Sequence, residues 1–69
     1  MSNWTPPDMN TAERCGFRWG ARHPHGDIRP AAKAYMHKVG TLAEKLAAEK
    51  DFTRGAACAQ IALKVVAHA

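Results

Sequence analysis

The last third of the chain carries apolar side chains around most of the circumference of the helix that it predicts. Asp51 is a favourable N-cap residue, and the apolar residues after it recur at steps of four and three positions, which predicts a helix over 51–68. One apolar series comprises Phe52, Ala56, Ala59, Leu63 and Val66, and a second comprises Cys58, Ile61, Ala62 and Val65. The polar strip between them is narrow and consists of Gln60, Lys64 and His68.

A helix this apolar has to be covered on most sides, and one partner helix of the same chain cannot cover it. We therefore expect 51–68 to supply both the core and the interface of an intertwined, two-fold homodimer. The residues expected in this interface are Cys58, Ile61, Ala62, Leu63, Val65 and Val66.

The residues that precede 51–68 also have a helical pattern, which predicts a second helix over 30–50. Asp27 can cap this helix, and Pro30 is favourable in a first turn. Gly40 interrupts the apolar stripe at a cost of about 1 kcal/mol relative to alanine. The two helices together predict a mainly α fold, a helical hairpin. The stripe itself consists of Ala32, Met36, Val39, Ala43 and Leu46.

The chain has 69 residues, which predicts a single small domain over 1–69. A domain of this size buries only about 60% of the surface of its unfolded chain, so a second copy is expected to stabilise it. The net charge of +4 suits an acidic protein surface or a nucleic acid. No signal peptide and no apolar stretch of the roughly 20 residues that span a bilayer are present, so we expect a soluble, cytoplasmic protein without a membrane partner.

Residues 1–29 read as an extended or loop-rich arm, with three of the four prolines and three of the five glycines. Within this arm, apolar residues alternate with arginines and glycines from Arg14 to Arg22, which favours a half-buried strand. The arginines also recur every four residues, as they would on one face of a helix. We favour the extended interpretation.

Catalytic and metal-binding patterns are weak. Cys15 lies among arginines that could activate a thiol, but no orienting acid accompanies it, and we expect a packed thiol. His23 and His25, with Asp27, could ligate zinc, although a proline-containing turn with exposed imidazoles is the simpler interpretation. No phosphate-binding glycine motif is present. We expect no enzymatic activity, no cofactor and no bound metal.

Arginine and aromatic residues instead indicate that the chain binds a partner. Such residues are enriched at binding hot spots, and arginine forks hold carboxylates and phosphates in a fixed geometry. The alternative is that the aromatic residues fill the core and the arginines face water. The expected partner-binding residues are Arg14, Phe17, Arg18, Trp19 and Arg22, with a second surface at Tyr35, His37 and Lys38.

Two functions fit these features. The first is a protein-binding inhibitor that caps a larger protein. The second is a homodimeric ribbon-helix-helix repressor, in which a strand from Arg14 to Arg22 would enter the major groove of DNA. The glycines of that segment and the loop after it disagree with the second function.

The whole chain resembles the quorum-sensing anti-activator proteins of Mu-like temperate phages of Pseudomonas. The resemblance lies in the leader Trp4-Thr5-Pro6-Pro7, the segment ARHPHGDIRPAAKAYMHKVG and the two-helix tail. It implies a homodimer that binds a LuxR-type transcription factor of the host and blocks its DNA binding. It also implies a second target, the ATPase that assembles type IV pili, whose inhibition would exclude competing phages.

Overall fold

A computed structural model describes residues 9–68 of the chain. Three helices account for most of this range: α1 (Thr11–Arg22), α2 (Ile28–Met36) and α3 (Leu42–His68). No strand occurs within it. The mainly α fold is therefore confirmed, although the helices number three rather than the two expected.

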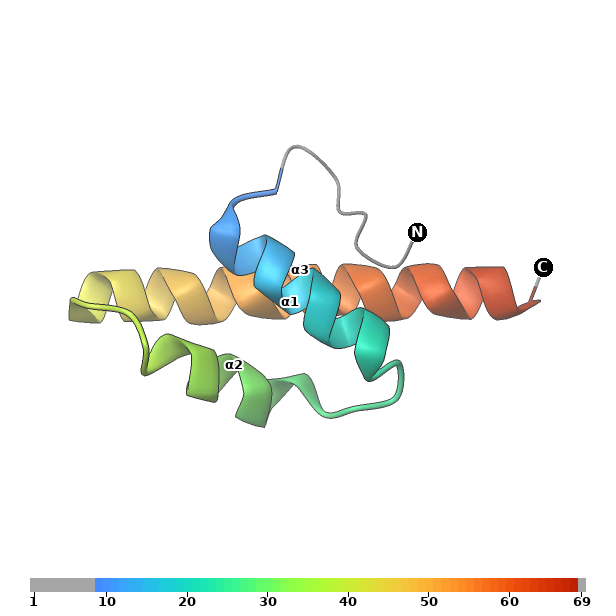
Figure 1. The fold of residues 1–69 in the computed structure, drawn as a ribbon, viewed down its shortest axis with the longest axis horizontal. Helices are drawn as coiled ribbons and strands as arrows, with labels where there is room; N and C mark the ends of the chain where they lie inside the picture. The colour runs from blue at the N-terminus through green and yellow to red at the C-terminus, as the bar shows by residue number, and fades with distance from the viewer. Residues whose placement is uncertain (1–8, 69) are drawn as a thin grey trace.

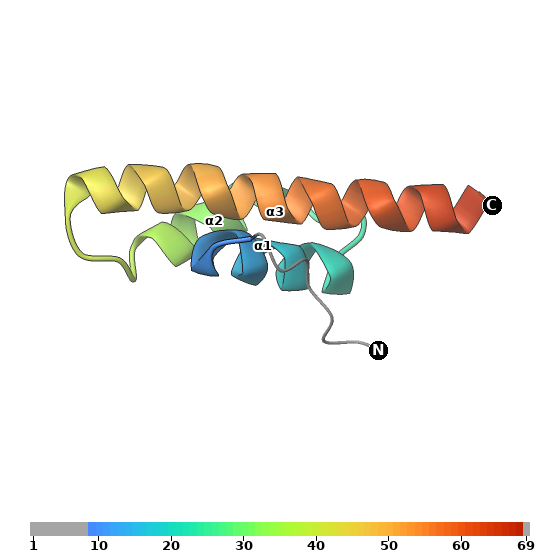
Figure 2. The same cartoon turned by 90° about the horizontal axis from the view of Figure 1, so that it is seen from above.

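The long helix α3 supports the two shorter helices. Both α1 and α2 lie on the same side of it, and its C-terminal end extends beyond them (Figures 1 and 2). α1 runs in the same direction as α3 and crosses it, whereas α2 runs back in the opposite direction (Figure 1). None of the helices in the described range is long and apolar enough to cross a membrane.

The segment predicted as a strand is helical. α1 begins at a capping box, in which the Asn10 side chain accepts a hydrogen bond from the Glu13 amide at 2.9 Å and Glu13 Oε1 accepts one from the Asn10 amide at 3.3 Å. The extended interpretation of Arg14–Arg22 is wrong because Gly16 and Gly20 are buried on the face toward α3. Cys15 and Trp19 pack on the core from the same side of α1, so the apolar stripe of this helix is short and is interrupted by glycine. Residues 1–8 of the predicted arm lie outside the described range.

The helix expected over 30–50 is interrupted. α2 ends at Met36, and the chain turns through residues 37–41 before α3 starts. Thr41 Oγ1 accepts from the Glu44 amide at 3.2 Å while Glu44 Oε1 accepts from the Thr41 amide at 3.2 Å, so this pair caps α3. Gly40 lies in the turn rather than inside a helix.

α3 also runs without a break through residue 51. Asp51 was expected to cap a helix there, but it lies in the middle of α3 and accepts a hydrogen bond from Asn10 Nδ2 at 3.0 Å. Its carboxylate therefore holds the start of α1 against α3.

The core is small. One aromatic ring lies at its centre, Phe52, whose ring centroid is 5.2 Å from that of Tyr35 and 6.2 Å from that of Trp19. The other buried apolar residues in the described range are alanines with little surface to contribute. The buried apolar residues are Ala32, Ala48, Phe52, Ala56 and Ala59.

Candidate protein-binding surface

Glycines fix how α1 presents its side chains. A Cβ on Gly16 would overlap the Phe52 carbonyl oxygen, and one on Gly20 would lie 2.5 Å from the Ala56 carbonyl oxygen. On the other helix, a Cβ on Gly55 would overlap the Glu13 carbonyl oxygen. The two backbones are thus in direct contact, and the opposite face of α1 points into solvent.

Arginines occupy that outward face. Arg14, Arg18 and Arg22 follow one another at intervals of one helical turn, and all three are exposed. Glu13, the one acidic residue of α1, is partly buried toward α3, where its carboxylate lies 3.7 Å from Arg54 Nη1. The stripe formed by Arg14, Arg18 and Arg22, here called the arginine stripe, therefore carries no acidic residue.

The aromatic residues predicted to bind a partner divide into two groups. Trp19 and Tyr35 pack on the core around Phe52, and Trp19 also contacts the ring of His23, with centroids 4.7 Å apart. Phe17 is half-buried and is not one of the residues that pack on this core. Phe17 follows Arg14 by three residues and directly precedes Arg18, so it borders the arginine stripe on the helix.

Tyr35 also meets Cys15 between α1 and α2. Burial raises the pKa of the Tyr35 hydroxyl, and the neighbouring Cys15 thiol raises it further through charge and a hydrogen bond. Cys15 itself is half-buried against the core, in agreement with the packed thiol expected.

His37 and Lys38 are exposed, but they lie at the C-terminal end of α2 and in the turn after it rather than inside a helix. Lys45 reaches back to this turn and donates to the carbonyl oxygens of Val39 at 2.5 Å, His37 at 3.4 Å and Met36 at 3.5 Å. The carbonyl groups here are therefore engaged with α3, and the side chains of His37 and Lys38 remain in solvent.

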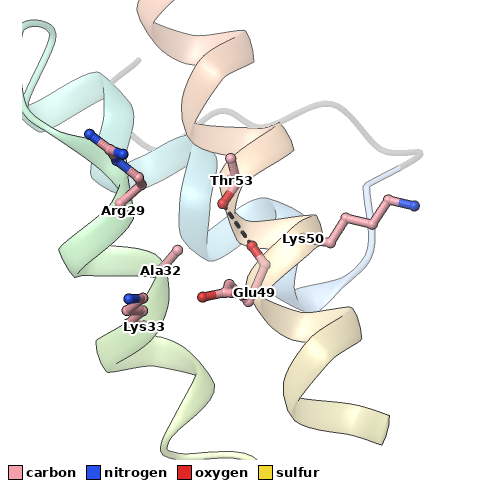
Figure 3. A pocket seen from close by; sticks show the side chains of 6 residues that line it. All are labelled: Arg29, Ala32, Lys33, Glu49, Lys50 and Thr53. Carbon is pink, nitrogen blue, oxygen red and sulfur yellow. Dashed lines mark hydrogen bonds between the residues drawn. The ribbon is translucent and has the colours of Figure 1, made fainter.

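The sequence did not indicate a shallow groove between α2 and α3 (Figure 3). Ala32 forms its buried floor, and Thr53 Oγ1 donates to the Glu49 carbonyl oxygen at 2.8 Å beside it. Arg29 is paired with Asp27 at 3.7 Å, and the Lys50 side chain points away from the groove. Opposite charges on its rim leave the groove without a dominant ligand chemistry. Its lining residues are Arg29, Ala32, Lys33, Glu49, Lys50 and Thr53.

The residues predicted for the dimer interface lie on a part of α3 that this chain leaves uncovered. Ile61 is 60% exposed, Leu63 is 37% exposed, and Cys58 and Ala62 are also exposed. Cys58, expected in the core as well, is therefore a surface residue of the single chain. The side chains of Val65 and Val66 lie outside the described residues.

The start of α3 exposes two further large apolar residues, Leu42 at 72% and Leu46 at 57%. The sequence placed Leu46 on a buried stripe, but the turn at residues 37–41 removes it from α2. In the sequence, the spacing of Leu42 and Leu46 by one helical turn was the feature that could have indicated this second apolar surface.

His23 and His25, weighed as zinc ligands, are both exposed in the loop between α1 and α2. Gln60 Nε2 holds this loop by donating to the carbonyl oxygens of His23 at 2.8 Å and Gly26 at 3.0 Å. Across the described range, no three His, Cys, Asp or Glu residues come together in an arrangement that could hold a metal ion.

Comparisons of the chain with protein-family models, with curated proteins and with solved structures found no match.

Proposed function

We propose that this chain is a homodimeric inhibitor that binds another protein stoichiometrically and catalyses no reaction. The observation that carries the proposal is the exposure of large apolar side chains on α3. Leu42 is 72% exposed, Leu46 57%, Ile61 60% and Leu63 37%. Burying one such side chain contributes about 1.5–3 kcal/mol, so these positions favour association with protein.

The small core favours association of the chain with a second copy of itself. Phe52 is the one large side chain among the buried apolar residues of the described range. A domain of this size gains little from such a core, and pairing along the uncovered side of α3 would add the missing apolar burial.

The target follows from the resemblance of the sequence to the phage anti-activators. It would be a LuxR-type transcription factor of the host, whose DNA binding the inhibitor blocks in the host cytoplasm, with the type IV pilus assembly ATPase as a second target. The ribbon-helix-helix alternative required a strand over residues 14–22. Those residues lie in α1, so no observation favours that alternative.

A DNA-release assay tests the proposal. Purified LuxR-type activator bound to labelled promoter DNA should release the DNA as the chain is added, with release complete near a one-to-one ratio of chains. Half that amount should release about half of the DNA, because a stoichiometric inhibitor does not turn over.

Promoter DNA without activator is the control, and the chain should not shift it. A shift in this control would support the repressor alternative, and full release at a small fraction of the activator concentration would contradict stoichiometric action. Inhibition of ATP hydrolysis by the purified pilus ATPase, titrated in the same way, tests the second target.

A further inference from the structure

Two arginines of α1 have no partner within the described part of the chain. Arg18 and Arg22 are exposed and form neither an ion pair nor a hydrogen bond there, whereas Arg14, the third member of the arginine stripe, takes part in an interaction. Because Gly16 and Gly20 bring the α1 backbone against α3, the helix that carries these arginines is held firmly in place.

Four acidic residues of the described range are engaged away from Arg18 and Arg22. Glu13 faces Arg54, and Asp27 pairs with Arg29. Glu44 caps α3 through Thr41, and Asp51 accepts a hydrogen bond from Asn10. Arg18 and Arg22 therefore form a local concentration of unpaired positive charge within the described range, on a chain whose net charge is +4.

We propose that Arg18 and Arg22 of the arginine stripe, with Phe17 beside them, bind a helical segment of a partner protein that carries carboxylates one turn apart. Side chains one turn apart on a helix are separated by about 5–6 Å at Cβ, so Arg18 and Arg22 match acidic residues spaced in the same way. Arginine forks hold carboxylates through paired hydrogen bonds. This inference rests on the proposed function, since it names the surface that would hold the target.

A protein partner fits the stripe better than a nucleic acid. Binding of the phosphate backbone of a nucleic acid rests on lysine and arginine charges and requires no apolar side chain. Aromatic residues and arginine are instead residue types that are enriched in protein–protein interfaces. Phe17 supplies the aromatic residue without being needed in the core around Phe52.

Fluorescence anisotropy with a labelled synthetic peptide tests the inference directly. The peptide is a helical alanine-rich sequence with glutamates at positions i and i+4, spaced as Arg18 and Arg22 are, and its counterpart has glutamines at the same positions. The full chain should bind the glutamate peptide at least about tenfold more tightly than the glutamine peptide at near-physiological salt, because charge-assisted hydrogen bonds are lost with glutamine.

The variant Arg18→Gln/Arg22→Gln should lose this preference. The matched control, Lys33→Gln/Lys50→Gln, removes the same charge from exposed positions on α2 and α3 and should keep it. An intermediate Arg18→Lys/Arg22→Lys variant retains the charge without the fork and should bind the glutamate peptide more weakly than the native chain. Circular dichroism should show the same helix content in all of them, since these side chains are exposed.

Equal loss in the control variant would overturn the inference, because the effect would then depend on net charge alone. If the Arg18→Gln/Arg22→Gln variant still prefers the glutamate peptide over the glutamine peptide, the inference is overturned too. The same holds if the native chain binds duplex DNA through these arginines and does not bind the peptide. Binding of the glutamate peptide without binding of a purified LuxR-type activator would uphold the inference and contradict the proposed target.

Discussion

At Gly16 the backbones of α1 and α3 are so close that a methyl group has no room. A Cβ there would overlap the Phe52 carbonyl oxygen, which cannot move without displacing α3. Gly16→Ala should therefore lower the free energy of unfolding by about 2 kcal/mol, even though alanine is the better helix former by about 1 kcal/mol. Urea denaturation followed by circular dichroism measures this change.

Gly40→Ala is the matched control for this substitution. Its Cβ would meet only Glu44 Oε1, at 3.4 Å, and its backbone does not require glycine. We expect a change within about 0.5 kcal/mol. Equal effects of the two substitutions would contradict the close crossing of α1 and α3.

Tyr35 should make the stability of the folded chain depend on pH. Its pKa is raised by burial and by Cys15 above the ordinary value of 10.0, so the folded state favours the protonated hydroxyl. The resulting stabilisation is complete below pH 10 and decreases as the pH rises through the higher pKa of the folded state. Denaturation midpoints of the native chain should therefore fall more steeply above pH 10 than those of Tyr35→Phe. Parallel curves for the two proteins would contradict this assignment.

At the scale of elements, periodicity predicted helices over 30–50 and 51–68, which is confirmed for 30–36 and 42–68, and it failed at the boundaries and in α1 for physical reasons. In α1 the apolar residues of the inward face, Cys15 and Trp19, stand next to glycines in the sequence, and their alternation with arginine and glycine favoured a strand. The boundary at Thr41 is marked in the sequence by the Thr-x-x-Glu spacing of a capping box with Glu44, but the favourable helix propensity on both sides of it favoured one continuous helix. The alternative in which aromatic residues fill the core and the arginines face water holds for Trp19 and for the exposed arginine stripe, whereas the sequence did not indicate that Tyr35 packs on Phe52.

The turn between α2 and α3 depends on one lysine. Lys45 Nζ donates to three carbonyl oxygens in and before this turn, the nearest being that of Val39 at 2.5 Å. Lys45→Met keeps most of the side-chain length but removes the donor, and should lower the free energy of unfolding by about 1 kcal/mol. Amide hydrogen exchange at His37, Lys38 and Val39 should become faster. Lys50→Met, at an exposed position on the same helix, should leave both measurements unchanged, and faster exchange in that control would contradict the role of Lys45.

At the scale of the molecule, the combination of a small core and a long exposed helix leads us to expect that folding depends on association. With alanines forming most of the buried apolar set, one copy gains little hydrophobic stabilisation, and pairing through α3 would supply more. The thermal midpoint of the chain should then rise with protein concentration, since a dimer is stabilised by mass action.

Ile61→Asp places a carboxylate at a position that is 60% exposed in one copy and would be covered in the pair. It should lower the mass measured by light scattering from that of two chains to that of one, with a loss of helix content at the same temperature. Lys38→Asp changes an exposed residue in the turn after α2 and should keep the mass of two chains. A thermal midpoint that does not change with concentration would contradict pairing through α3, and so would an Ile61→Asp protein that keeps the mass of two chains. If Ile61→Asp is instead a fully helical monomer, the alanine core is sufficient by itself.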